Sequence, residues 1–260
     1  MSQPTRYRAT IAYVGTEFHG WQRQKNAPRT VQAVLEAALE HLARAPVRLE
    51  GASRTDAGVH ADGQVAHFDL PRRRDPRAVR DAINGRLSED VRVLAVEETA
   101  PEFHARFDAG WKEYVYRWSR AGVIAPRDRP FVARISPRAD AERLRAAASI
   151  VAGERDFRIF AVTPPAGEST VRNLHAITVR EQGAELQALF RGDGFLRGMV
   201  RSICGVLSDM ARGRVPADRM ARLLETGDRR LLSHKAAAHG LTLCRVFYEP
   251  TAPRRATIET

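Results

Sequence analysis

The chain has 260 residues, of which 43% are hydrophobic and 28% are charged. That length and composition suit one or two domains with a buried core, which excludes a disordered chain and a miniprotein held together by disulfides. Lysine and arginine number 42 against 31 acidic residues, giving a net charge of +11 at pH 7. This excess makes polyanions the favoured class of partner.

The cysteines and histidines do not indicate a metal site. Cys204 and Cys244 show neither a CxxC spacing nor a disulfide framework, and the eight histidines lack ligand patterns such as HExxH. We therefore predict no metal. Because no apolar run approaches the ~18 residues that span a bilayer, and the start at Met1 lacks the apolar stretch of a signal peptide, we expect a cytoplasmic protein without membrane insertion.

The first half of the chain alternates strand and helix patterns. Apolar residues recur at every second position from Tyr7 to Tyr13, which predicts a strand, and at three- and four-residue spacing after Thr30, which predicts a capped helix. The predicted elements are a strand Arg6–Val14, a helix Val31–Leu42, strands Val47–Glu50 and Gln64–Leu70, a helix Pro76–Leu87 and a strand Val91–Thr99.

The second half repeats that order of elements. The patterns predict a strand Arg106–Ser119, a helix Ala139–Val151, strands Val171–Arg180 and Leu186–Arg191, a helix Phe195–Ala211, an additional helix Pro216–Glu225 and a strand Leu241–Phe247. Each half therefore has the order of a ferredoxin-like split βαβ unit. We predict an α+β fold of two such halves with antiparallel sheets and a cleft where they meet. The predicted domains are residues 1–103 and 104–248, followed by a mobile tail, 249–260.

A polar loop between two predicted strands carries the strongest chemical signal. Residues 51–61 contain a cation, a hydroxyl, a carboxylate and an imidazole, from Arg54, Thr55, Asp56 and His60. Taken alone, Thr-Asp-Ala-Gly also fits a plain turn, in which the aspartate accepts backbone hydrogen bonds and glycine supplies a positive φ. Unusual polar and aromatic combinations at 18–22 and 63–65 favour a functional loop.

Several motifs, in order, resemble the tRNA pseudouridine synthase A family. They are Arg-Thr-Asp-Ala-Gly-Val-His-Ala at 54–61 with Gly-Gln-Val at 63–65, Phe-His-Gly-Trp-Gln at 18–22, Phe-His-Ala-Arg-Phe at 103–107, Lys-Glu-Tyr-Val-Tyr at 112–116, Phe-Leu at 195–196 with Met-Val-Arg at 199–201, and Ala-His-Gly-Leu at 238–241. The resemblance covers roughly residues 6 to 248. It implies a pseudouridine synthase fold of two pseudo-symmetric halves around a central cleft, and a homodimer.

The resemblance also implies the reaction, which is the isomerisation of uridine to pseudouridine at positions 38, 39 and 40 of the tRNA anticodon stem-loop. It implies no cofactor. Asp56 matches the catalytic aspartate of the family, whose attack is argued for C1′ or C6 of the uridine, or to leave a glycal. Arg201 matches the arginine expected to pair with that carboxylate, and Tyr114 the tyrosine that stacks on the target uracil.

Other residues carry weaker expectations. Arg54 is the candidate to fill the space that a flipped uridine leaves, since such enzymes extrude their target base. Four further residues have two alternative roles, either a contact with RNA or a structural hydrogen bond beside the site. They are His19, Gln22, His60 and Gln64. Tyr116 and Trp118 share a strand face with Tyr114, and for these two an aromatic core role is predicted.

Two functions of other classes compete with the synthase. An RNA-binding protein without catalysis would fit the positive charge, and a hydrolytic glycosidase acting on nucleic acid would need a second carboxylate, for which the loop offers only Asp62. Three positions depart from the common family pattern, at Gly198, Ile159 and Thr242, and bear on local packing and tRNA contacts.

Overall fold

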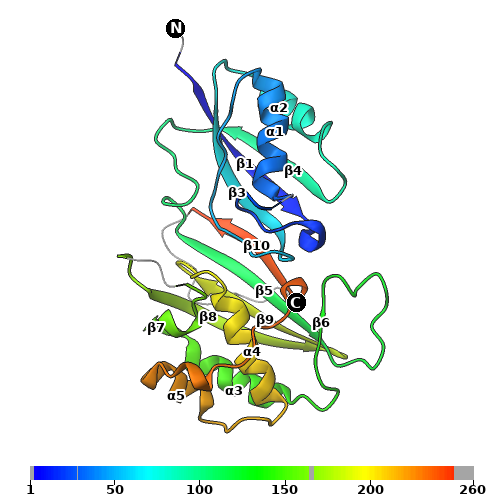
Figure 1. Cartoon of the computed structure of the whole chain (residues 1–260), viewed down its shortest axis with the longest axis vertical. Coiled ribbons are helices and arrows are strands. Elements are labelled where there is room, and N and C mark those ends of the chain that lie inside the picture. Colours follow the sequence, from blue (N-terminus) through cyan, green and yellow to red (C-terminus); the bar gives the residue numbers. More distant parts are fainter. Residues whose placement is uncertain (1–2, 28, 164–166, 249–260) are drawn as a thin grey trace. The chain divides into compact units, whose positions relative to one another are not determined.

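The computed structural model describes residues 3–27, 29–163 and 167–248 (Figure 1). Contacts divide it into two compact units. The first reaches Ala109 and also includes Thr242–Val246, whereas the second runs Gly110–Leu241 and resumes at Phe247. The sequence prediction instead divided the chain between 103 and 104. The predicted mobile tail, 249–260, lies outside the described residues.

The first unit is a mainly antiparallel sheet with two helices. Its elements are β1 (Thr5–Tyr13), α1 (Val31–Ala43), β2 (Glu50–Gly51), β3 (His60–Leu70), α2 (Pro76–Asn84), β4 (Val91–Glu98) and β10 (Leu241–Phe247), together with a 3-10 turn, Gly15–Glu17. The strand order is β4-β1-β3, and β2 pairs with β3 antiparallel while β10 pairs with it in parallel. Figure 1 shows α1 and α2 in front of these strands.

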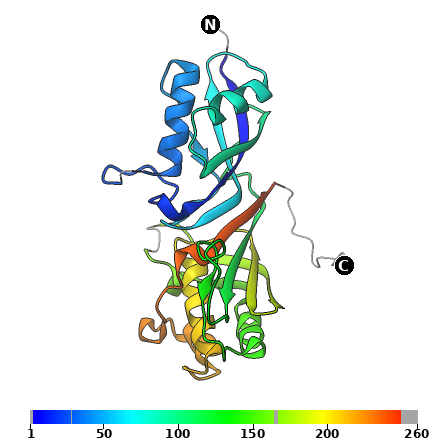
Figure 2. The ribbon, with the colours of Figure 1, turned by 90° about the vertical axis from the view of Figure 1, so that its right-hand side faces the viewer.

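The second unit has an antiparallel sheet in the order β5-β9-β8-β7. Its strands are β5 (Trp111–Ser119), β6 (Ala133–Arg134), β7 (Gly153–Asp156), β8 (Val171–Gln182) and β9 (Glu185–Gly192), and β6 pairs with β5 in parallel. Its helices are α3 (Ala141–Val151), α4 (Met199–Ala211) and α5 (Arg219–Thr226), with 3-10 turns at Arg158–Phe160, Arg229–Leu231 and Ala238–Gly240. Figure 2 shows this unit from the side, with α4 in yellow. The protein is therefore a mixed α+β fold.

The predicted core faces are buried. In β1 the alternate residues Tyr7, Ala9, Ile11 and Tyr13 are at most 5% exposed, as the period of two predicts. The hydroxyl oxygen of Thr30 accepts a hydrogen bond from the backbone N–H of Ala33 and so caps α1, as predicted. In the described part of the chain, no helix is both long and apolar enough to cross a membrane.

Two of the largest shifts in the start of a predicted element have local reasons. The strand predicted from Arg106 begins at Trp111, because the His104 ring nitrogen Nδ1 accepts the backbone N–H groups of Arg106 and Phe107 and so forms a turn there. The helix predicted from Phe195 begins at Met199, because Gly198 has φ +75°, a left-handed conformation that a right-handed helix excludes.

A third predicted element, the strand at 47–50, is largely absent, and its backbone instead contacts side chains of α1. The predicted strand 47–50 contributes only Glu50 to β2. The backbone N–H of Leu49 donates to the carboxylate of Glu36, and its carbonyl accepts from the amide of Gln32. Two side chains of α1 thus take the place of a neighbouring strand. The short strands β6 and β7 were not predicted, and the four residues of β7 lack an apolar alternation.

Candidate active site

Asp56 lies in the loop between β2 and β3 and is half-buried. Its neighbour Thr55 is buried, with its hydroxyl 2.8 Å from that of Tyr13 at the end of β1. The pairing of β1 with β3 shifts register between Ile11 and Tyr13, which is an irregularity of the kind that re-aims side chains beside active sites. The end of β1 therefore fixes the residue next to the carboxylate.

The segment 18–22 packs directly against this loop. Phe18 and Trp21 are buried, the Trp21 backbone N–H donates to the carbonyl of Thr55 at 3.1 Å, and the Phe18 carbonyl accepts from Gly58 at 3.2 Å. Gly20 permits the close approach, because a Cβ at this position would lie 2.7 Å from the Thr55 carbonyl oxygen and the residue has φ +87°. The two motifs that stood out in the sequence form one packed structure.

Gln64 and His60 hold the loop from inside the unit. The Gln64 side chain is fully buried, and it accepts from the backbone N–H of Ser53 and donates to the Ser53 carbonyl at 2.8 Å. His60 is also buried, and its Nδ1 accepts the backbone N–H of Gly15 at 3.0 Å. These contacts support a structural hydrogen-bonding role for both residues. A contact of either residue with RNA remains a prediction.

The other predicted RNA contacts of the first unit are nearer the surface. Arg54 and His19 are exposed. Gln22 is half-buried, and its amide donates to the side-chain oxygen of Gln32 at 2.7 Å. Arg54 and His19 therefore have solvent-exposed side chains beside the Asp56 loop.

Arg201 and Tyr114 belong to the second unit. Arg201 is half-buried in the first turn of α4, where its Nε donates to the carbonyl of Ala236 at 2.9 Å. Tyr114 in β5 is 5% exposed, and its ring meets Phe195 edge to face with 5.0 Å between ring centroids. The expected ion pair between Asp56 and Arg201 joins residues of different units and remains a prediction.

Tyr116 and Trp118 are core residues, as predicted. Tyr116 is fully buried and donates its hydroxyl to the Ala237 carbonyl, while the Trp118 indole N–H donates to Ser208. Burial raises the pKa of Tyr116 well above its ordinary value, so that the phenol stays protonated and keeps this hydrogen bond. Both rings anchor β5 through these hydrogen bonds.

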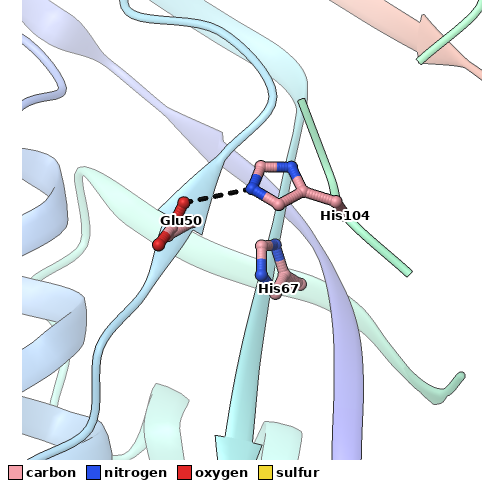
Figure 3. A group of neighbouring side chains, drawn as sticks. All are labelled: Glu50, His67 and His104. Atoms are coloured by element: carbon pink, nitrogen blue, oxygen red, sulfur yellow. Dashed lines mark hydrogen bonds and ion pairs between the residues drawn. The ribbon is translucent and has the colours of Figure 1, made fainter. Parts of the chain in front are cut away.

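Three side chains of the first unit form a polar cluster, Glu50, His67 and His104 (Figure 3). Nε2 of His104 lies 3.2 Å from a Glu50 oxygen, and the two imidazole centroids are 4.7 Å apart. Nδ1 of each histidine accepts backbone N–H groups, His67 from Ala105 and His104 from the turn that follows it. In its neutral form, each ring therefore carries its proton on Nε2.

This proton arrangement does not suit a metal ligand. A histidine that binds a metal normally donates its second N–H outward, whereas here both second nitrogens accept. Metal binding through Nε2 would break the backbone hydrogen bonds that hold the 104–107 turn against β3. Burial, followed by the neighbouring His104 and Arg6, lowers the pKa of His67, which keeps it neutral.

A family model described as tRNA pseudouridine synthase matches residues 9–108 and 147–249, well over half of the chain. The chain belongs to this family. The tRNA pseudouridine synthase A of Maricaulis maris (strain MCS10) is 42% identical, over 94% of this chain and 98% of its own length. That of Nitratidesulfovibrio vulgaris (strain DSM 19637 / Miyazaki F) is 39% identical, over 94% and 99%.

The tRNA pseudouridine synthases are isomerases, so this chain is an enzyme of that class. The family match includes Asp56 and Arg201, whereas Tyr114 falls between the two matched ranges. A solved structure, titled "Crystal Structure of a Cbf5-Nop10-Gar1 Complex", aligns at a TM-score of 0.35 and 12% identity, over 91% of this chain and 48% of that chain. This similarity is too low to support a conclusion.

Sequence reasoning missed residues that hold the Asp56 loop and the segment before it. Tyr13 entered only as a core residue of the first strand, and Gln32 only as part of a helix. Their partners Thr55 and Leu49 lie 42 and 17 positions away. No local spacing signals such pairs, although a threonine directly before the aspartate indicates a hydroxyl in need of a partner.

Proposed function

We propose that this chain isomerises uridine to pseudouridine in tRNA, at positions 38, 39 and 40 of the anticodon stem-loop. The observation that carries the proposal is Asp56, a half-buried carboxylate in a loop fixed on both sides, within a chain of the tRNA pseudouridine synthase family. The net charge of +11 suits a tRNA substrate. We further propose two pseudo-symmetric ferredoxin-like halves with a cleft between them, and a cytoplasmic homodimer.

The reaction is an internal rearrangement. The N1–C1′ bond breaks, the uracil turns, a C5–C1′ bond forms, the proton leaves C5 and N1 gains a proton. Atoms and electrons balance without an oxidant, a reductant or a cofactor. The protein must supply a nucleophile or base, hold the detached uracil and move a proton.

Asp56 supplies the nucleophile in this scheme. Attack at C1′ would displace uracil and leave an ester between Asp56 and the ribose, which C5 of the turned uracil then displaces. Attack at C6 of the base or formation of a glycal are the alternatives. Arg201 pairs with the carboxylate, because a neighbouring guanidinium favours the ionised form that all nucleophilic routes require.

Tyr114 and Arg54 handle the base. The target uridine lies in or beside a stem, so extruding it costs a few kcal/mol of unstacking. Stacking of the uracil on Tyr114 recovers roughly 1–3 kcal/mol of that cost. Arg54 enters the space the base leaves in this scheme, and its exposure to solvent supports that role.

The test uses tRNA carrying tritium at uridine C5. We expect wild-type protein to release tritium to water, and Asp56→Asn to lose this release by at least about 10³-fold while its tRNA affinity stays within a few-fold. Asp62→Asn is the matched control, since it makes the same chemical change at a nearby exposed residue in β3.

The alternatives give different results. Tight binding without release by wild-type protein would indicate the RNA-binding protein, and free uracil in the product would indicate the glycosidase. Transcripts with a single uridine at position 38, 39 or 40 test the choice of site, since each is expected to release tritium.

A further inference from the structure

The second unit contains a cavity that the proposed chemistry does not use. Its volume is about 710 Å³, and it lies between α4, the segment after β5 and the segment 234–239. Tyr116 and Trp118 form part of its wall. The backbone of segment 234–239 is tied to α4, because Ala236 bonds with both the backbone carbonyl and the side chain of Arg201.

The side chains that line the cavity are strongly cationic. One carboxylate, that of Asp209, faces five cations, Arg129, Arg134, Arg212, Arg214 and Lys235. His239 adds no charge near neutrality, because burial lowers its pKa, with Arg129 and Arg201 acting in the same direction. The cavity therefore carries a formal excess of positive charge.

The single carboxylate does not satisfy these cations. Asp209 lies 3.7 Å from Nη1 of Arg212 and 4.0 Å from Nη1 of Arg214, distances too long for hydrogen bonds. The buried Nε of Arg212 has no hydrogen-bond partner among the described residues. An unsatisfied buried guanidinium donor beside other cations is the environment that an oxyanion would stabilise.

The arrangement suits a chain of phosphates better than one compact anion. Arg129, Arg134, Arg214 and Lys235 are exposed, and they come from three separate stretches of the sequence. A site for a small anion converges buried donors on one point, whereas exposed cations spread over a surface can each meet a different phosphate.

We propose that this cavity binds the phosphodiester backbone of the RNA substrate, at nucleotides other than the target uridine. This inference rests on the proposed function for the identity of the RNA. Its ligand chemistry is the phosphate oxyanion, and its contacts are to the backbone, so that they position the RNA without reading its sequence.

The test compares two double variants of equal charge change by filter binding of a tRNA transcript. Arg129→Gln with Lys235→Gln removes two cations from the cavity. Arg155→Gln with Arg222→Gln removes two exposed cations that do not line it. All four positions are exposed, so that both proteins are expected to fold.

The expected difference is in the salt dependence. Each phosphate contact contributes about 0.9 to the slope of log affinity against log salt, so loss of two contacts lowers the slope by about 1.8. Raising salt from about 50 to 200 mM should then weaken tRNA binding about twelvefold less in the cavity variant than in the wild type. The control should keep the wild-type slope. Equal slopes in the two variants would overturn the proposal.

Two further arms separate the remaining possibilities. Titration with inorganic diphosphate tests for a small-anion site. If wild-type protein binds diphosphate tightly, and the cavity variant loses that binding but keeps the wild-type affinity for tRNA, the assignment to RNA is overturned. The slope measurement needs no turnover. A wild-type protein that makes no pseudouridine would refute the proposed function, while the slopes would still decide the cavity.

Discussion

The loop around Asp56 and the helix around Arg201 are stabilised by different interactions. The loop has no regular structure, and polar contacts to β1, to segment 18–22 and to Gln64 fix it. Helix α4 is buried along most of its length by apolar side chains, and Arg201 is among its few half-buried residues. A segment held by directional hydrogen bonds and close backbone contacts is disturbed by the addition or loss of a single atom. A helix held by apolar burial tolerates such substitutions better.

This contrast separates the expected effects of substitution. Changes near Asp56 should alter stability and turnover together, because the same contacts hold the loop and aim the carboxylate. Changes at Arg201 should alter turnover with little effect on stability, since the apolar residues of α4 remain.

Arg201→Met should lower turnover by about 10²- to 10⁴-fold, because Asp56 loses its proposed partner, while tRNA affinity changes little. Single-turnover rates and filter binding measure the two quantities. The control is Arg197→Met, an exposed arginine just before the helix. Turnover near the wild-type value would refute the ion pair, and a large fall in the unfolding free energy would contradict the comparison.

Gly20→Ala should destabilise the protein by about 2–4 kcal/mol and lower turnover with it. The new Cβ would lie 2.7 Å from the Thr55 carbonyl oxygen, in a residue with φ +87°. Gly183→Ala is the matched control, because Gly183 also has a positive φ, +56°, but open space around it, and roughly 1 kcal/mol is expected there. Urea unfolding of both variants measures the difference, and equal losses would show that close packing at Gly20 contributes nothing.

His67 should give a small, pH-dependent effect. Its pKa is lowered in the folded state, mainly by burial, so the unfolded chain binds the proton more readily. Stability is therefore complete above the unfolded pKa of about 6.5 and falls as pH drops below it, by at most about 1.4 kcal/mol per pH unit.

Unfolding of wild type and His67→Gln between pH 7.5 and 5 tests this effect, with the exposed His41→Gln as control. The groups that face His67 are His104, Arg6, Glu50 and Asp69, and neither substitution changes any of them. If the stability of the wild type and of His67→Gln depends on pH in the same way, His67 is not the source of the pH dependence.

Sequence patterns predicted the elements wherever a single period ran through them. The alternation in β1 and the spacing in α1 placed both elements within one or two residues, and the Thr30 cap was correct. Prediction placed β3 four residues too late, at Gln64 instead of His60, and it also failed at 47–49, 106–110 and 195–198. The last three failures have a clear cause. There, side chains of Glu36, Gln32 and His104, or the left-handed Gly198, decide the backbone, and none of these changes the local apolar pattern.

Periodicity and ordered motifs are local properties, so the sequence alone suffices to predict the α+β class, the order of the longer elements and the family. It also singled out Asp56, Tyr114 and Arg201. The tertiary contacts were needed to show that Gln64 hydrogen-bonds to the loop backbone at Ser53 and that His60 accepts the backbone N–H of Gly15. They were also needed to show that Gly20 lies against Thr55 and that five cations share one cavity. Each of these facts joins residues far apart in the chain, and folding alone sets such distances.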